Sequence, residues 1–509
     1  MTLARDRDTT RRLRVAAVSA KQASARRLGR MNIDERVATL ADDGTFVSLL
    51  ARTRSRAPWS GPPEERPEGD GLLAGVAQVR GRQTMVIAHD PRFRRGALGE
   101  RGAQTATFAI GRAVELGIPV VFLSDSDGAR VQEGLSGIAA NAELLGTIAR
   151  ASGRVPLVCA TLGLSGGAAG YGAALCDLNV AVADRSFSFI TGPQVIRSVT
   201  GEDTTLEEIG GTSMHAQKTG LLHATAAADA DAIEWVKDAL SYLPQNAWSL
   251  PPAAASVDAD DPHECGAGDV VPVEQRRGYD VRKLVARLVD QRSFFELAAA
   301  YARNIVTGFA RLDGGVVGVI ASQPMQLGGV LDGPASIKLA RFLRMCVAFN
   351  VPVVTLCDSP GFMPGVKLER EGLLLHGAKV ISAYAEARGS IPLVALIVRK
   401  SIGAASVLSY GADIVLALPT AHVAAMGTQG VLRVAFGTEF DGLAPEVLEE
   451  QRLAAQRLHE DPEAALRIGY AHRLIQPEHA RRELVSAISM CKGTTLAPIG
   501  GRKLTNIPL

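Results

Sequence analysis

The sequence predicts an α/β protein made of two copies of one fold in tandem. First, the apolar run IPVVFLSDSDG (118–128) matches VPVVTLCDSPG (351–361), and their aspartates lie 358 − 125 = 233 positions apart. Second, VPLVCATLGLSGGAAG (155–170) matches IPLVALIVRKSIGAAS (391–406) at a separation of 391 − 155 = 236 positions, and TGPQVI (191–196) faces GTQGVL (427–432) at the same separation. Third, strand patterns alternate with helix patterns inside each copy, which is typical of α/β domains.

The expected elements follow one another in the same order in both copies. VVFLS (120–124) is a short apolar run that predicts a buried strand, and residues 141–152 have the apolar spacing of a helix. Residues 155–163 predict the next strand, and a helix begins after the following glycines. Further strands are expected at 177–184 and 412–419. Residues 279–304 begin with a helical pattern similar to that of 31–53, so a helix leads into each copy.

The boundary between the copies is expected in residues 243–264. This stretch is rich in Pro, Ala and Asp and has no regular period, which favours a linker. We therefore expect one domain over residues 1–255 and a second over 256–509.

Composition limits the classes of function. The chain has 509 residues, 47% hydrophobic and 21% charged, and a net charge of +2, which does not indicate nucleic acid or an acidic membrane as a partner. No apolar run reaches the roughly 18–20 residues that span a bilayer. The six cysteines form no C-x-x-C pair, so we expect no bound metal. Several of them lie in apolar runs, which predicts small, buried core residues with free thiols, as in proteins of a reducing compartment. The Arg-rich first 30 residues lack the apolar core of a secretory signal and predict an exposed amphipathic helix, so a cytoplasmic protein is expected.

One stretch, GLSGGAAGYG (163–172), has almost no side chains. In both copies a strand leads into such a Gly/Ala turn and then into a helix. A helix N-terminus carries free N–H groups and partial positive charge, and small residues let a ligand approach the backbone. Such a turn can stabilise an oxyanion that forms during a reaction. The glycines can also serve only close helix–sheet packing, but their recurrence in both copies favours a site; the phosphate-loop pattern G-x-x-x-x-G-K-[ST] is absent.

These residues, with others spread from Gly69 to Leu509, carry a family resemblance. The matching segments are GDGLLAGVAQVRGR, DSDGARVQEG, SGGAAGYGAALCD, FITGPQVIRSVTGED, YARNIVTGFARLDG, CDSPGFMPG, HGAKVISAYAEA and the terminal NIPL. Together they resemble the carboxyltransferase β subunits of biotin-dependent acyl-CoA carboxylases, such as propionyl-CoA carboxylase. That family belongs to the crotonase-like superfamily, so the resemblance implies two tandem crotonase-like domains.

The resemblance also implies a reaction. A carboxyl group passes from carboxybiotin, carried on a separate protein, to the α-carbon of an acyl-CoA, which is acetyl-CoA, propionyl-CoA or a longer or unusual thioester. Biotin itself acts as the base, and two oxyanions form, so two oxyanion holes are needed. By resemblance, Gly166 and Gly167 hold the thioester oxygen, and Gly403, Ala404 and Ala405 hold the ureido oxygen of biotin.

Further residues take implied roles at the edges of the site. Those on the acyl-CoA side are Arg130, Gln132, Gly134, Gly192, Pro193 and Val407, and those beside biotin are Asp358, Gly361 and Phe362. Arg130 could equally be a CoA phosphate ligand or part of a structural ion pair. His215 and His376 are expected to be structural, because the reaction needs no base from the protein.

Departures and absences refine this expectation. Asp127 stands where the family has a glycine, and the second turn reads Gly-Ala-Ala-Ser instead of the family's Gly-Gly-Ala-Tyr. There is no biotinylation motif and no ATP-binding carboxylase domain, so a biotin carboxylase and a biotin carrier are implied partners. Family members are hexamers, trimers of dimers. Two alternatives stay open: a biotin-dependent decarboxylase or transcarboxylase subunit acting on a malonyl-type CoA, and a divergent non-catalytic subunit.

Overall fold

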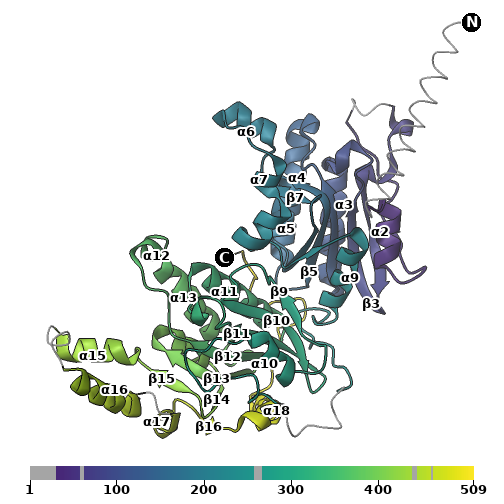
Figure 1. The fold of residues 1–509 in the computed structure, drawn as a ribbon. Coiled ribbons are helices and arrows are strands. Elements are labelled where there is room, and N and C mark those ends of the chain that lie inside the picture. Colours follow the sequence, from purple (N-terminus) through teal and green to yellow (C-terminus); the bar gives the residue numbers. More distant parts are fainter. Residues whose placement is uncertain (1–29, 58–61, 257–265, 438–443, 460–461, 509) are drawn as a thin grey trace, which may run out of the picture. The chain divides into compact units, whose positions relative to one another are not determined.

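A computed structural model describes residues 30–57, 62–256, 266–437, 444–459 and 462–508. The predicted N-terminal amphipathic helix lies outside these residues. Contacts divide the chain into two compact units: unit 1 comprises Met1–Ala151, Leu157–His215 and Ala224–Ala239, and unit 2 comprises Ser152–Pro156, Ala216–His223 and Leu240–Leu509. Each unit contains one eight-stranded sheet covered by helices (Figure 1). The prediction of two α/β copies in tandem is confirmed.

The sheet of unit 1 runs in the order β1-β2-β3-β4-β5-β6-β8, and β7 pairs with the C-terminal end of β5. β1 to β3 are antiparallel, and from β3 to β8 the neighbours are parallel. The strands are β1 Val47–Leu49, β2 Leu72–Val79, β3 Arg82–His89, β4 Val120–Ser126, β5 Leu157–Gly166, β6 Leu178–Val182, β7 Phe187–Phe189 and β8 Ala224–Ala226. β4 includes the predicted strand 120–124, and β5 overlaps the predicted 155–163 but begins at Leu157 and continues to Gly166. Both are buried along most of their length, as parallel strands covered on both faces must be.

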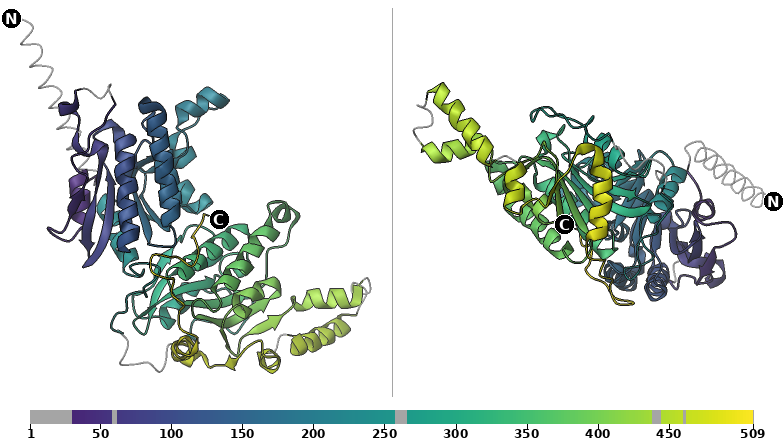
Figure 2. Two further views of the ribbon diagram at one scale, coloured as in Figure 1. Left: turned by 180° about the vertical axis from the view of Figure 1, so that it is seen from behind. Right: turned by 90° about the horizontal axis from the view of Figure 1, so that it is seen from below.

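Two long helices pack side by side in unit 1, α3 (Glu100–Leu116) and α4 (Gly134–Ala151) (Figures 1 and 2). α3 buries mostly small residues, which lets its backbone approach its neighbours closely, and it ends at Gly117 in the left-handed conformation (φ 65°) typical of a helix C-terminus. The other helices of this unit are α2 Ile33–Leu40, α5 Ala168–Ala174, α6 Pro193–Thr200, α7 Leu206–Gly210, α8 Thr212–Met214 and α9 Asp229–Leu240. α4 is longer than the predicted 141–152 because the helix already begins at Gly134.

The sheet of unit 2 has the same plan, in the order β16-β14-β13-β12-β11-β10-β9, with β15 paired to the end of β13. Its strands are β9 Phe295–Leu297, β10 Ile305–Leu312, β11 Gly315–Ser322, β12 Val353–Ser359, β13 Leu393–Ile402, β14 Ile414–Ala417, β15 His422–Ala424 and β16 Arg473–Leu474. Its helices are α10 Val281–Leu288, α11 Gly333–Ala348, α12 Val366–Arg370, α13 Leu373–Ala387, α14 Val407–Tyr410, α15 Thr428–Phe436, α16 Pro445–His459, α17 Pro462–Arg467 and α18 Ala480–Met490. α11 and α13 pack together as α3 and α4 do, and apolar residues of α10 and α18 share a core cluster with the sheet.

The two units agree in fine detail as well as in plan. The register between β4 and β5 shifts between Ser124 and Ser126, and that between β12 and β13 shifts between Cys357 and Ser359. These irregularities lie 233 positions apart, the separation seen between the aspartates in the sequence. The repeat is therefore one of structure down to a single bulge.

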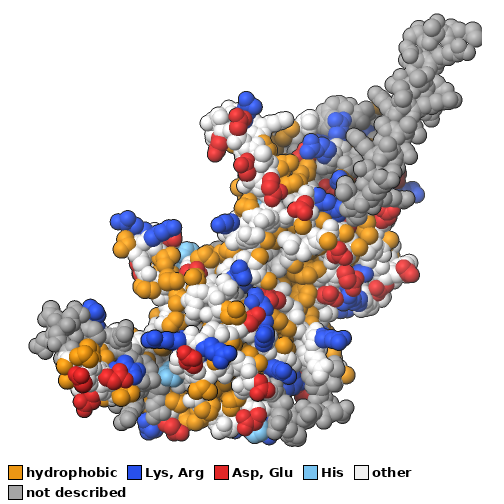
Figure 3. All heavy atoms as spheres, viewed as in Figure 1, with side chains coloured by type: hydrophobic (Ala, Val, Ile, Leu, Met, Phe, Trp, Pro, Cys, Tyr) orange, Lys and Arg blue, Asp and Glu red, His pale blue; other side chains and the backbone are white. Residues whose placement is uncertain are grey.

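The surface and the core fit the composition. Cys159, Cys346 and Cys357 are buried, as their apolar surroundings predict. Acidic and basic side chains are interspersed over the face in Figure 3 and form no large basic patch there. Among the described residues, no helix combines the length and apolar character needed to cross a bilayer.

Candidate functional site

The first glycine-rich turn joins β5 to α5. β5 ends at Gly166, and α5 begins at Ala168, so Gly167 is the single residue between them. Its backbone has φ 50° and ψ −117°, which only glycine adopts without strain. Gly167 donates its N–H to the carbonyl oxygen of Phe189 at 2.8 Å, so this amide is already occupied within the protein.

The amides that follow Gly167 have a different position. Ala168 and Ala169 are the first two residues of α5, where a helix leaves its N–H groups without intrahelical partners. No side chain in the described structure caps this end of the helix. Both residues are half-buried, and their amides lie at the N-terminal, positive end of the helix.

Several glycines around this turn are required by close backbone contacts. A Cβ atom on Gly166 would lie 3.0 Å from the carbonyl oxygen of Asp127, and one on Gly128 would lie 2.8 Å from the carbonyl oxygen of Gly166. A Cβ on Gly170 would lie 2.8 Å from the carbonyl oxygen of Ser165. The glycines are therefore needed for close packing here, and this need is compatible with the uncapped helix amides that an oxyanion site requires.

The second turn joins β13 to a short helical segment over Gly403–Ser406, which continues into α14. Gly403 again has a left-handed backbone (φ 62°), and a Cβ on it would lie 3.4 Å from the carbonyl oxygen of Ala425. Ala404 is exposed and Ala405 is buried. No side chain of the described residues caps this segment, so it offers backbone donors of the same kind as the first turn.

A hydroxyl cluster that sequence reasoning missed supports the second turn. Ser401 Oγ and Ser409 Oγ lie 2.9 Å apart, and the hydroxyl of Tyr470 lies 3.1 Å from the first and 2.9 Å from the second. Ser409 also donates to the carbonyl oxygen of Ser406 at 3.0 Å. Burial raises the pKa of Tyr470, so the cluster is neutral and joins the turn to β13. Serines are too common for spacing to reveal such a group.

Of the residues assigned to the biotin side, Gly361 lies next to this turn. A Cβ on Gly361 would lie 3.6 Å from the carbonyl oxygen of Ile402, the last residue of β13. Phe362 forms a bridge with Leu331 and is partly buried. Asp358 is 1% exposed and paired with Arg399, so its carboxylate faces the interior of the unit and not its surface.

On the acyl-CoA side, Gly192 and Pro193 stand at the start of α6, where a Cβ on Gly192 would lie 3.8 Å from the ring of Phe189. The same ring lies 3.0 Å from the Cβ position of Gly166, so Phe189 brings α6 to the first turn. Phe189 was not predicted as a site residue, because a lone aromatic in a strand carries no distinguishing pattern. Val407, half-buried, is the first residue of α14 in unit 2.

Arg130 has a buried place inside unit 1. Its guanidinium lies 2.6 Å from Asp70 and 3.0 Å from Glu133, donates to the carbonyl oxygens of Asp70 and Ala97, and stacks over the ring of Phe93. It is 2% exposed. The structure thus favours the structural ion pair over the CoA phosphate contact. Gln132 and Gly134, just beyond it, are exposed.

Asp127, the departure from the family pattern, lies at the surface. Its carboxylate is 37% exposed and lies 3.4 Å from Nε of Arg95, and its N–H donates to the carbonyl oxygen of Arg95 at 3.1 Å. Its own carbonyl oxygen faces Gly166. The extra carboxylate therefore has a local partner and leaves the backbone contact at the turn intact.

The two histidines have structural surroundings. His215 Nε2 lies 2.7 Å from the carbonyl oxygen of Ser188, and burial lowers the pKa of His215. His376 packs against Gly333, whose Cβ position lies 3.2 Å from the imidazole ring. Within the described ranges, no group of three or more His, Cys, Asp or Glu side chains is placed to hold a metal ion.

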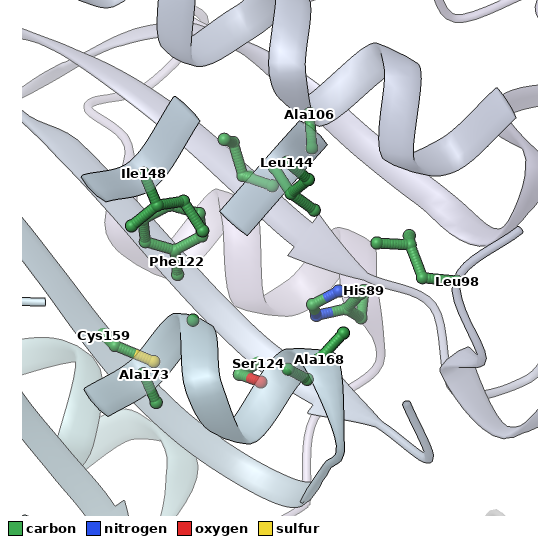
Figure 4. A pocket seen from close by; sticks show the side chains of 13 residues that line it. His89, Leu98, Ala106, Phe122, Ser124, Leu144, Ile148, Cys159, Ala168 and Ala173 are labelled. Atoms are coloured by element: carbon green, nitrogen blue, oxygen red, sulfur yellow. The ribbon is translucent and has the colours of Figure 1, made fainter. Parts of the chain in front are cut away.

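A small cavity lies beside the first turn (Figure 4). It has a volume of about 30 Å³, and its lining is almost wholly apolar. Ala168, Ala169 and Ala173 of α5 form one wall, and Phe122 and Cys159 of the sheet form another. His89 also lines it, and burial lowers the pKa of His89 to about 4, so this imidazole is neutral near pH 7. The cavity offers the turn an uncharged pocket that sequence reasoning did not predict.

Comparisons with known proteins agree on one family. The model of the carboxyl transferase domain matches residues 24–500. The propionyl-CoA carboxylase beta chain of Saccharopolyspora erythraea is 39% identical over 97% of this chain and 92% of its own length. The methylmalonyl-CoA decarboxylase subunit alpha of Propionigenium modestum is 36% identical over 94% of each chain. A crystal structure of the transcarboxylase 12S hexamer with hydrolysed methylmalonyl-CoA bound has a TM-score of 0.88 and 34% identity, covering 94% of this chain and 93% of that one.

Proposed function

The chain belongs to the carboxyl transferase family of the biotin-dependent acyl-CoA carboxylases, and from this premise we propose that it transfers a carboxyl group from carboxybiotin on a carrier protein to the α-carbon of an acyl-CoA. The observation that carries the proposal is the pair of strand–glycine–helix turns, one in each unit, with uncapped helix amides. A reaction that forms two oxyanions needs two such sets of donors.

The first turn would hold the thioester oxygen of the acyl-CoA. Gly166 and Gly167 shape the turn, and the amides of Ala168 and Ala169 supply the donors, because the Gly167 N–H is bonded to Phe189. As a proton leaves the α-carbon, negative charge moves onto the thioester oxygen, and fixed donors at a helix N-terminus stabilise it. One such donor is worth about 2.7–4 kcal/mol of transition-state stabilisation.

The second turn would hold the ureido oxygen of biotin through Gly403, Ala404 and Ala405. This turn suits a polar, uncharged oxygen acceptor. Ala404 is exposed, the amides are uncapped, and the hydroxyl cluster beside the turn is neutral. Carboxybiotin, when bound, supplies the carboxyl group and, by family resemblance, the base. Val407 and Gly361, next to this turn, and Phe362, the residue after Gly361, would shape the two substrates' surroundings.

Other assigned residues would act at the periphery. Gln132 and Gly134 are exposed beyond Arg130 and are proposed to line the CoA entrance, while Gly192 and Pro193 form a wall through Phe189. Arg130 is proposed to keep this region in shape through its ion pairs. Asp358 is proposed to act on biotin only indirectly, because it is buried.

The proposal also covers which part of the chain serves each substrate, the oligomeric state and the partner proteins. We assign residues 1–255 to the acyl-CoA side and 256–509 to the biotin side. The transcarboxylase 12S relative is a hexamer, and we propose a hexamer here as well. A biotin carboxylase and a biotin carrier subunit would supply carboxybiotin in the cytoplasm.

A second candidate function has specific support. A methylmalonyl-CoA decarboxylase subunit and a transcarboxylase cover almost the whole chain, at 36% and 34% identity. The same turns would serve removal of a carboxyl group from a malonyl-type CoA. A non-catalytic role is disfavoured, because both turns keep their donors.

The test is a carboxylation assay with the purified chain, a biotinylated carrier, its biotin carboxylase, ATP and labelled bicarbonate. Acyl-CoAs from acetyl-CoA upward are offered one at a time, and acid-stable label is counted. Label on one or more acyl-CoAs supports the carboxyltransferase. Label on none, together with loss of carboxyl from methylmalonyl-CoA onto the carrier, would support the decarboxylase or transcarboxylase instead.

A further inference from the structure

Two buried carboxylates occupy equivalent places in the two units. Asp125 stands near the end of β4 and Asp358 near the end of β12, and they are 2% and 1% exposed. Asp125 Oδ1 accepts the N–H of Leu164 at 3.3 Å, and Asp358 Oδ1 accepts the N–H of Lys400 at 3.2 Å. Each carboxylate therefore holds the neighbouring strand at a point three residues before the glycine of the turn, which is Gly167 in unit 1 and Gly403 in unit 2.

The contact replaces a bond that the sheet does not make there. In both units the parallel register shifts between the residues on either side of the aspartate. A strand amide next to such a shift lacks its usual ladder partner, and a buried N–H must be bonded to something. The carboxylate supplies that acceptor, so it determines where the strand backbone lies as it enters the turn.

The neutralising cation comes from a different element in each unit. In unit 2, Arg399 of β13 donates from Nε to Asp358 Oδ2 at 2.9 Å. The equivalent position in unit 1 is Gly163, whose Cβ would lie 2.1 Å from Asp125 Oδ1, so no side chain fits. There the cation is Arg36 of α2, fully buried, at 2.9 Å from Asp125 Oδ2.

Arg36 is itself fixed on other sides. Its Nε lies 2.9 Å from Asp229 Oδ2, and its Nη2 donates to the carbonyl oxygen of Leu162 at 3.2 Å. The partly exposed Arg30 also reaches Asp125 at 2.9 Å. Burying charges is costly unless they are paired. The same carboxylate thus stands at the same point of both units with a different cation partner in each, which points to a common role at that point.

We propose that Asp125 and Asp358 are matched positioning residues, each aligning the donors of one turn through the strand that precedes it. The inference rests on the proposed function: Asp125 with Arg36 serves the acyl-CoA half of the reaction, and Asp358 with Arg399 serves the biotin half. Neither carboxylate touches a substrate. Their effect reaches the reaction through Leu164 and Lys400.

The chain offers matched controls at the opposite ends of the same strands. Asp177 accepts the N–H of Leu157 at 2.9 Å, and Asp413 accepts the N–H of Leu393 at 2.9 Å. These bonds have the same chemistry but lie at the starts of β5 and β13, far along each strand from the turn. Asp177→Asn and Asp413→Asn therefore report what loss of a strand-anchoring carboxylate does to structure alone.

The experiment compares Asp125→Asn and Asp358→Asn with these controls in the full chain, assembled with its carrier and biotin carboxylase. We expect Asp125→Asn to raise KM for acyl-CoA by about tenfold and to leave KM for the biotinylated carrier within about twofold, since a misplacement of about 1 Å can cost about 10²-fold and the expected displacement is smaller. Asp358→Asn should show the reverse. The controls should change thermal stability and neither KM. Equal shifts in both KM values, or values like those of the controls, would overturn the proposal.

A second readout does not need turnover. Hydrogen exchange measured by mass spectrometry should rise over residues 164–171 in Asp125→Ala and over residues 400–407 in Asp358→Ala, because alanine removes the acceptor oxygen that asparagine keeps. In Asp177→Ala and Asp413→Ala it should rise only at the strand starts. Unchanged exchange at the turns would refute the positioning role even if the wild-type chain carboxylates nothing. If the asparagine variants fail to fold, Arg36→Lys and Arg399→Lys keep the charge, and the same division between the two substrates is expected with smaller size.

Discussion

Gly167 donates its backbone N–H to the carbonyl oxygen of Phe189 at 2.8 Å. This bond closes the end of β7 against the turn and removes the Gly167 amide from the donors that a ligand could use. The donors at this turn are accordingly the next two amides, those of Ala168 and Ala169. The glycine provides the backbone conformation, and in the proposed reaction the alanine amides are the donors.

The first prediction removes one donor without removing the helix. Proline is well tolerated at the first position of a helix, where it lacks only an N–H that the helix does not use, so Ala168→Pro should fold. We expect kcat for acyl-CoA carboxylation to fall by about 10²–10³-fold, the usual effect of losing one oxyanion donor. Ala168→Gly keeps the N–H and serves as the control, with activity within a few-fold of wild type. An active proline variant would exclude this amide from the site.

Much of the fold could be predicted from the sequence because the repeat is visible in short segments whose structure depends on neighbouring residues. Apolar strands ending in Asp-Ser-x-Gly recur 233 positions apart and the Gly/Ala turns 236 positions apart, and each becomes a strand end or a turn. The partners that support the turns were not predictable in this way. Arg36 meets Asp125 from a helix 89 positions earlier in the chain, and Tyr470 meets Ser409 from 61 positions later. Only folding brings them together, and no spacing rule relates them.

The second prediction concerns acid stability. Burial lowers the pKa of His89 to about 4 from an ordinary value of 6.5, so between these values the unfolded chain binds a proton that the folded chain does not. The free energy of unfolding is therefore unaffected by this proton above pH 6.5, and it falls as the pH decreases towards 4, by up to about 3 kcal/mol. His89→Gln should flatten this part of the profile, measured as the difference in thermal midpoint between pH 7 and pH 5. Equal profiles for both proteins would contradict a buried neutral imidazole.

The third prediction concerns the cavity beside the turn. A group the size of a water needs about 10–15 Å³, so the cavity of about 30 Å³ takes about two such groups. If acyl carbons beyond the α-carbon enter it, Ala173→Val should lower kcat/KM for butyryl-CoA and longer substrates relative to acetyl-CoA by about tenfold, as expected for losing one or two buried methylenes. Ala174→Val, on the same helix but not lining the cavity, is the control. An unchanged ratio would place the acyl chain elsewhere.

The last prediction separates the two roles of Arg130. A buried arginine that pairs with Asp70 and Glu133 holds backbone in place, and removing one partner of such a pair typically costs about 3–5 kcal/mol. Arg130→Lys keeps the charge but cannot make the forked contacts with Asp70 and Ala97, so the thermal midpoint should fall by several degrees. If Arg130 only supports structure, the ratio of KM values for an acyl-CoA and its dephospho-CoA analogue stays the same in wild type and variant. A phosphate ligand would behave differently: the variant would lose much of its preference for the phosphorylated substrate while its melting changed little.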